Sequence, residues 1–186
     1  MCFFYDLLYN TIMKLILIDL QKALVVDDLY NYKNLVKNVA KLLKTARNLK
    51  IDIVFIQHDA GEGSGFSIGD IGYEIYDRFK PIEGEHVFSK TINSAFGNKE
   101  FSSYLKSSED KNLMIVGLQT EFCIDATIKS AYEKGYKVYV PKICHSTFDN
   151  KYSKAKDVIK YYNEWIWEGT FANVITLKEA IRILGK

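Results

Sequence analysis

The chain of 186 residues is poor in proline and cysteine and has no excess of either charge. It contains only 2 prolines, so we expect long structured segments and few loops. Its 3 cysteines are an odd number, which argues against a disulfide scaffold and for a reducing, cytoplasmic compartment. Lys and Arg number 25 against 23 Asp and Glu, without a basic run, so no nucleic-acid partner is expected.

Long apolar runs are also missing. No stretch approaches the ~20 apolar residues that a membrane-spanning helix needs, so the sequence predicts no membrane partner. The apolar segment 1–12 (MCFFYDLLYNTI) lacks the basic region and the small-residue cleavage site of a signal peptide. We therefore expect residues 1–12 to be a short N-terminal extension in front of one domain, which spans residues 13–186.

The sequence contains a regular alternation of apolar runs and amphipathic segments. Short continuous apolar runs are typical of strands that are buried on both faces of a parallel sheet. The alternation predicts an α/β fold, a single-domain Rossmann-like parallel sheet with helices on both faces. Strands are expected over residues 14–18, 51–57, 85–89, 113–117, 137–141 and 173–176, and helices over residues 31–49, 98–107, 121–134, 153–166 and 177–184.

Three reactive side chains follow the ends of predicted strands. Asp19 ends the first strand, Lys90 follows the third, and Cys123 follows the fourth. The carboxyl ends of parallel strands meet at one edge of the sheet, where open α/β folds bind ligands, so we expect these side chains to converge. The second strand leads into a glycine-rich loop over residues 58–72 (HDAGEGSGFSIGDIG), and loops of this length are often functional.

Cys123 is the most informative of the three residues. Thr120 is a good N-cap, which would make Cys123 the third residue of the helix that follows. The positive end of the helix dipole favours a thiolate there and lowers the thiol pKa, and main-chain N–H groups of the same turn can donate to an oxyanion. The alternative is a buried structural cysteine, which is the commoner fate of an unpaired Cys.

Asp19 and Lys90 also have ordinary explanations. A carboxylate at the end of the apolar strand LILID needs a partner or a role, because an unpaired buried charge is costly. Asp19 could instead cap the turn that ends the strand. Lys90 lies in the polar stretch VFSKTINSAF and could be one of many exposed lysines.

Four blocks of the chain resemble, in order, those of the isochorismatase-like cysteine hydrolases. This superfamily includes nicotinamidases, N-carbamoylsarcosine amidases and isochorismatases. The blocks are LILIDLQ, VFIQHD, FSKTINSAF and IVGLQTEFCIDATIKSAYEKGYKVYV, within residues 13–148. The resemblance implies the isochorismatase-like hydrolase fold, which agrees with the order of elements above. It also implies a cysteine hydrolase that cleaves an amide-type C–N bond of a small-molecule substrate, and it leaves that substrate open.

The resemblance assigns a catalytic triad to Asp19, Lys90 and Cys123. Asp19 would be the general base for the thiol proton, and Lys90 would keep Asp19 ionised and stabilise the thiolate. Cys123 would attack the carbonyl carbon and form an acyl-enzyme. The resemblance also implies a non-proline cis peptide bond between Leu118 and Gln119. This bond would aim the N–H of Gln119, together with that of Cys123, at the oxyanion.

The chain departs from the metal-binding nicotinamidases after the second strand. Those enzymes have Asp-x-His there and a further His nearby, whereas this chain has Gln57 and Asp59 at the first two positions, and His86 lies too far along. We therefore expect no metal and no other cofactor, and a nicotinamidase is disfavoured. An isochorismatase proper is also disfavoured, because its hydrolysis of a vinyl ether does not need Cys123.

Four further residues are weaker candidates for a substrate pocket. Gln21 lies two residues past Asp19, and His58 opens the long loop. Phe66 and Phe96 could form an apolar wall for a planar substrate. Each has a structural alternative, because hydrogen-bonded histidines and core aromatic residues are common in folded domains.

Two other classes of function stay open. The chain could be a non-catalytic small-molecule-binding or scaffold member of the same fold, in which case Cys123 would react with iodoacetamide no faster than Cys2 or Cys144. It could also act in redox chemistry, although no resolving partner is marked. A Cys144–His145 pair is disfavoured, because adjacent residues seldom point at each other. Relatives often assemble, so the resemblance implies a homo-oligomer, either a dimer or a tetramer.

Overall fold

The computed structural model describes residues 13–185, so the expected N-terminal extension over residues 1–12 lies outside the described part. The described residues form a parallel sheet of seven strands with the order β3-β2-β1-β4-β5-β7, and the short β6 pairs with β4. The predicted α/β fold with a parallel sheet is confirmed. The strands are β1 (Met13–Ile18), β2 (Asp52–His58), β3 (His86–Lys90), β4 (Asn112–Leu118), β5 (Lys137–Pro141), β6 (His145–Ser146) and β7 (Asn173–Ile175).

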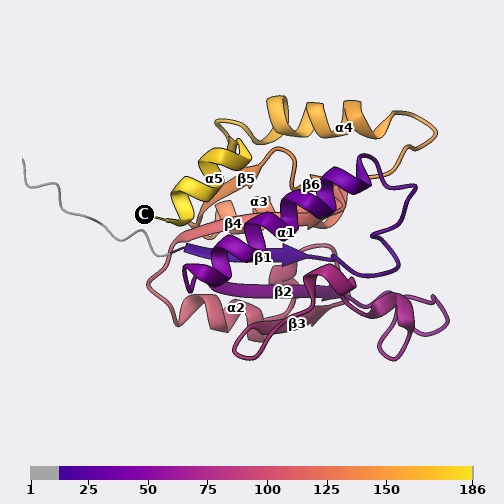
Figure 1. The fold of residues 1–186 in the computed structure, drawn as a ribbon, viewed down its shortest axis with the longest axis horizontal. Helices are drawn as coiled ribbons and strands as arrows, with labels where there is room; N and C mark the ends of the chain where they lie inside the picture. The colour runs from indigo at the N-terminus through magenta and orange to yellow at the C-terminus, as the bar shows by residue number, and fades with distance from the viewer. Residues whose placement is uncertain (1–12, 186) are drawn as a thin grey trace, which may run out of the picture.

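Helices cover both faces of this sheet. Figure 1 shows α1 lying across one face with α5 next to it, and these two helices are in contact. No helix among residues 13–185 combines the length and the apolar character needed to cross a bilayer. The α-helices of this part of the chain are α1 (Tyr32–Asn48), α2 (Lys99–Lys106), α3 (Asp125–Glu133), α4 (Ala155–Tyr161) and α5 (Leu177–Leu184).

Alternate residues of β1 divide the hydrophobic core into two layers. Leu15 and Leu17 pack in the layer that contains the buried face of α1 and α5, whereas Ile16 and Ile18 pack in the layer that contains α2 and α3. All six residues of β1 are buried, because the strand lies in the middle of the sheet with helices on both sides. Polar side chains can therefore reach solvent or a ligand only at the strand ends.

The segments after β4 and α4 form π-helical turns, which are wider than the turns of a regular α-helix. A π-helical turn over Thr120–Ile124 precedes α3, and a second one over Tyr162–Trp167 follows α4. The expectation that Thr120 caps the helix is wrong. Gln119 takes the cap position without a side-chain bond, and the hydroxyl of Thr120 is buried against His145.

β6 is a strand of two residues that the apolar pattern does not predict. Its residues pair with the end of β4, so that His145 lies opposite Gly117 and Ser146 lies opposite Leu118. This pairing brings the segment after β5 alongside the turn that carries Cys123.

Candidate active site

Asp19, Lys90 and Cys123 come together at the carboxyl edge of the sheet. Asp19 directly follows β1, Lys90 is the last residue of β3, and Cys123 lies in the turn after β4. The Lys90 ammonium lies 2.8 Å from Asp19 Oδ2 and 3.2 Å from Cys123 Sγ. The three residues are only 1%, 3% and 8% exposed, so their interactions are weakly screened by solvent.

The backbone at Asp19 turns its side chain into the site. Asp19 has φ 52°, in the left-handed region that Asp tolerates better than most residues, and its N–H still donates to the carbonyl of Ile56 (2.9 Å). Oδ2 accepts from Lys90, whereas Oδ1 is buried and has no hydrogen-bond partner among the described residues. Oδ1 is therefore a carboxylate oxygen with capacity to accept a proton.

Burial dominates the electrostatics of the site. It raises the pKa of Asp19, and the neighbouring Lys90 ammonium opposes this increase. Burial also raises the pKa of the Cys123 thiol to about 12, and the Asp19 carboxylate adds to the rise. The expectation of a lowered thiol pKa is therefore wrong, because desolvation and the Asp19 carboxylate outweigh Lys90. The resting thiol is protonated and needs a base before it can attack.

The Lys90 ammonium binds a third group, His58, whose Nδ1 lies 3.1 Å away. Its three N–H donors can thus serve Asp19, His58 and Cys123 at the same time. The donor atoms of those three residues lie within 4.8 Å of one another, a spacing that could hold a metal ion. The Lys90 ammonium lies at hydrogen-bond distance from all three side chains, so a fixed cation already contacts them.

The positions that hold metal ligands in nicotinamidases are used differently here. Gln57 donates its amide N–H to the carbonyl of Tyr73 (2.8 Å). Asp59 accepts from the N–H of Gly61 (3.0 Å) at the start of the glycine-rich loop. Both side chains therefore bind main-chain groups at the two ends of the glycine-rich loop.

The peptide bond between Leu118 and Gln119 is cis, at the position that the resemblance implies. The carbonyl of Gln119 then accepts from the N–H groups of Phe122 and Ile124, both at 3.2 Å. These two bonds bracket Cys123, and they close the wide turn that carries the thiol.

Gly117 controls how closely β4 approaches β1 beside the site. It has φ 127° and lies opposite Ile18, the residue before Asp19. A Cβ atom at this position would collide with the main chain of Ile18. The absence of a side chain at Gly117 therefore lets the strands that carry Asp19 and Cys123 lie side by side.

The four weaker pocket candidates differ in where they lie. Gln21 is buried, and its amide donates to the carbonyls of His58 (3.0 Å) and Tyr73 (2.8 Å) while accepting from the His58 N–H (2.8 Å). Phe66 packs on the ring of His58 with a centroid distance of 5.8 Å. Gln21 and Phe66 thus hold His58 in place from two sides.

Phe96 takes a different position from the other candidates. Its ring packs against Phe101 and Tyr136, with centroid distances of 5.3 and 5.9 Å. These contacts belong to the core layer on the side of α2 and α3.

Asn93 is a site residue that the sequence analysis misses. Its Oδ1 lies 3.8 Å from Cys123 Sγ, and the residue is exposed, so its amide is open to a ligand beside the thiol. Asn93 belongs to the block FSKTINSAF, three residues after Lys90. That spacing from the end of β3 was the available signal.

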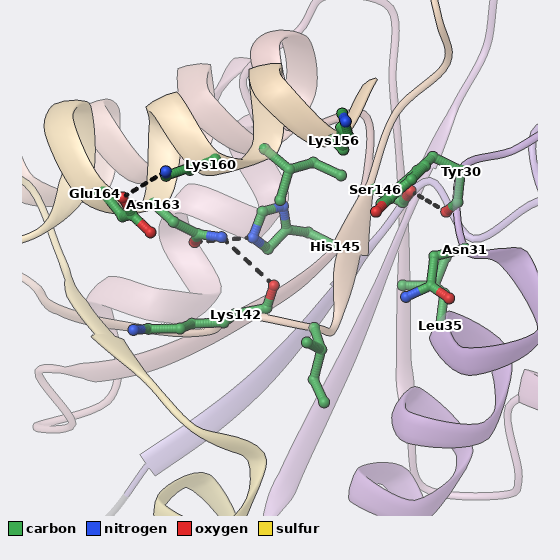
Figure 2. A pocket seen from close by; sticks show the side chains of 12 residues that line it. Tyr30, Asn31, Leu35, Lys142, His145, Ser146, Lys156, Lys160, Asn163 and Glu164 are labelled. Carbon is green, nitrogen blue, oxygen red and sulfur yellow. Dashed lines mark hydrogen bonds and ion pairs between the residues drawn. The ribbon is translucent and has the colours of Figure 1, made fainter. Parts of the chain in front are cut away.

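The segment at β6 fastens the turn that carries Cys123. Nδ1 of His145 accepts from the Thr120 hydroxyl (2.9 Å), and Thr147 donates to the Gln119 side chain (3.3 Å). His145 Nε2 donates to Asn163 Oδ1 (3.1 Å), as Figure 2 shows beside a pocket of about 260 Å³. Burial lowers the pKa of His145 to about 4, so the ring is neutral.

Cys144 is placed away from these groups. It lies in the core layer on the side of α1, whereas Cys123 lies in the layer on the opposite face of the sheet. The His145 ring nitrogens are used by Thr120 and Asn163, so they do not form a pair with the Cys144 thiol.

Comparison with known proteins connects most of the chain to one family. A family model described as "Isochorismatase domain" matches residues 13–179. The chain is 33% identical over 110 residues to the isochorismatase family protein YddQ of Bacillus subtilis, which is 58% of this chain and 61% of YddQ.

Two further relatives have names that state an activity. The chain is 30% identical over 108 residues to a streptothricin hydrolase of Streptomyces noursei (58% of this chain, 39% of that protein). It is 32% identical over 75 residues to the ureidoacrylate amidohydrolase RutB of Pseudomonas savastanoi (40% of this chain, 31% of that protein). The chain thus spans less than two thirds of the length of these two relatives and of YddQ.

Solved structures share the fold along nearly the whole chain. An isochorismatase-family protein from Chromobacterium violaceum superimposes with a TM-score of 0.88 at 24% identity, covering 95% of both chains. An isochorismatase hydrolase from Oleispira antarctica superimposes with a TM-score of 0.85 at 26% identity, covering 93% of this chain and 97% of the other.

Proposed function

Because the chain belongs to the isochorismatase family, we propose that it is a cysteine hydrolase that cleaves an amide-type carbon–nitrogen bond of a small molecule. One observation carries the proposal: the buried ammonium of Lys90 contacts both the Asp19 carboxylate and the Cys123 thiol. The name of the relative RutB, an amidohydrolase, supports an amide as the bond that is cleaved.

The first step is attack of the Cys123 sulfur on the amide carbonyl carbon. The thiol is protonated at rest, because its pKa is raised to about 12, so its proton must move as the carbon–sulfur bond forms. Asp19 Oδ1, which is buried without a partner among residues 13–185, takes this proton. Lys90 stays beside both groups and compensates the negative charge that shifts from carboxylate to substrate.

The carbonyl electron pair moves to oxygen in this step. The N–H groups of Gln119 and Cys123 donate to the resulting oxyanion, in the turn that the cis peptide bond opens. Asp19 then returns its proton to the leaving nitrogen, the carbon–nitrogen bond breaks, and ammonia or an amine departs from a thioester.

Water completes the cycle. Asp19 takes a proton from water as the water oxygen attacks the thioester carbonyl, and the carbon–sulfur bond breaks to release a carboxylic acid. The proton returns to sulfur, so the resting site is restored. Each step uses the side chains of Asp19, Lys90 and Cys123 and needs no metal ion.

The proposal is tested by measuring ammonia or amine release from a panel of small amides. Cys123→Ala should lower the rate by at least about 10³-fold with the fold intact, because the covalent route is lost. Cys144→Ala is the matched control, because Cys144 is also buried but lies on the other face of the sheet. Retained release of ammonia or amine by Cys123→Ala would contradict the proposal. Binding of amides by a wild-type protein that releases no product would instead support the non-catalytic member of the fold.

A further inference from the structure

His58 has no part in the steps above, yet it is held firmly beside the reacting groups. Gln21 binds both the main-chain N–H (2.8 Å) and the main-chain carbonyl (3.0 Å) of His58, and Phe66 packs on the His58 ring. In the sheet, His58 lies directly opposite Lys90. A residue whose main chain is fixed and whose ring contacts both Phe66 and Lys90 is preorganised for contact with a ligand.

The contact with Lys90 determines which ring nitrogen of His58 carries the hydrogen. An ammonium can only donate, so Nδ1, 3.1 Å from Lys90 Nζ, must be the unprotonated acceptor. A neutral ring then carries its hydrogen on Nε2. Burial and Lys90 lower the pKa of His58 against the opposing charges of Asp19 and Asp59, and the net lowering favours the neutral ring.

The Nε2–H group is available to a ligand. It has no hydrogen-bond partner among residues 13–185, and it is not sealed from solvent as Asp19 Oδ1 is. A nitrogen of the same ring lies within 4.8 Å of both the Asp19 carboxylate and the Cys123 sulfur. A substrate whose carbonyl carbon contacts the thiol therefore places its neighbouring atoms close to the imidazole ring that carries this donor.

We propose that His58 is a specificity-determining residue whose Nε2–H binds a hydrogen-bond acceptor of the substrate next to the scissile amide. Such an acceptor is a second carbonyl oxygen or a ring nitrogen. The inference rests on the proposed function and narrows its substrate class to small amides that carry this second acceptor. One net hydrogen bond corresponds to about a tenfold preference over a substrate without the acceptor.

The test compares kcat/KM for matched substrate pairs. The probes are the three pyridinecarboxamides against benzamide, and pyruvamide against isobutyramide. A ring nitrogen or an α-carbonyl also makes the amide carbonyl more electrophilic, so the part of the preference that is due to His58 is read by comparing the wild-type protein with His58→Asn. The wild-type protein should favour an acceptor-bearing member about tenfold more strongly than His58→Asn does. His58→Asn keeps an acceptor near the Nδ1 position but has no atom at Nε2, so it should lose this additional preference. His58→Gln places an amide N–H near Nε2 and should keep part of it.

The control and a second measurement separate the possible outcomes. His86→Asn should keep the full preference, because His86 is exposed on β3 and its ring packs against Tyr104. Nitrogen NMR of the 3 histidines should show His58 protonated on Nε2. Cys123-dependent hydrolysis with the same acceptor preference in the wild type and in His58→Asn, or an Nδ1-protonated ring, overturns the role of His58 alone. Absence of Cys123-dependent hydrolysis of every amide overturns the proposed function, and the role of His58 with it.

Discussion

A single ammonium organises the candidate site at the scale of the residue. Lys90 contacts Asp19, His58 and Cys123 with separations between 2.8 and 3.2 Å, and it is 3% exposed. The sequence alone cannot predict this burial, because Lys90 stands among polar residues after a short strand. Only its position after a strand end, together with the family resemblance, singles it out from the other lysines. Asn93, three residues further along the same block, had the same signal in a weaker form.

Replacing Lys90 should damage both stability and activity. Lys90→Met leaves Asp19 buried without its partner, which we expect to lower the free energy of unfolding by about 3 kcal/mol. The double variant Asp19→Asn with Lys90→Met removes the unpaired charge and should recover part of this loss. Both variants should be inactive. Urea unfolding measures the effect on stability, and the amide assay measures the effect on activity. A Lys90→Met variant as stable as the wild type would contradict the predicted loss of stability.

At the scale of the element, the turn after β4 is the part that sequence patterns describe least well. A π-helical turn and an α-helix place apolar residues at similar spacings, so the periodicity predicts a helix over 121–134 without the wider first turn. β6 has two residues, too few to show a strand pattern, and Gly117 lies opposite it. The role of Gln21 in fastening the loop was likewise hidden, because it depends on main-chain groups distant in sequence.

The buried His145, which is hydrogen-bonded to Thr120 and Asn163, should make the free energy of unfolding depend on pH. Its pKa is lowered from 6.5 to about 4 in the folded chain, so the unfolded chain binds the proton more tightly. Stability is therefore fully present above about pH 6.5 and is lost as the pH falls toward 4. We expect this group to contribute a loss of about 2 kcal/mol in unfolding free energy between about pH 7 and pH 5.

Comparison with two variants isolates this contribution. His145→Gln should show a flatter dependence of unfolding free energy on pH than the wild type over the same range, as measured by urea unfolding. His86→Gln, at an exposed position on β3, should retain the wild-type slope. Equal slopes in His145→Gln and wild type would rule out His145 as the source.

At the scale of the whole molecule, the two-layer core was the most predictable property. Continuous apolar strands such as β1 and the apolar spacing along α1 predict a parallel sheet covered on both faces, and the structure has this architecture. These apolar patterns depend only on residues close together in the sequence, so they can be read from the sequence alone. The thiol pKa was predicted in the wrong direction, because it depends on the burial of Cys123 by elements from the whole sheet.

The separation of the two core layers also bears on redox chemistry. Cys123 and Cys144 are buried on opposite faces of the sheet, so mild peroxide should produce no disulfide between them. Mass spectrometry of digested, peroxide-treated protein checks this, with Cys144→Ala as the comparison. A substantial yield of the Cys123–Cys144 disulfide would contradict this prediction and support a redox function.

The close approach at Gly117 has a consequence for how such a protein can acquire new substrates. Any side chain there would push apart the strands that carry base and nucleophile, so this end of β4 tolerates almost no variation. The loop over residues 59–71 faces no comparable constraint, since a Cβ added at Gly61, Gly63, Gly65 or Gly69 meets no neighbour, although their positive φ angles favour glycine. Gly72, at the end of this loop, is the exception, because a Cβ there would collide with the carbonyl of Gly65. Directed evolution toward a different amide should therefore accumulate its accepted changes in that loop, while the sheet edge stays invariant.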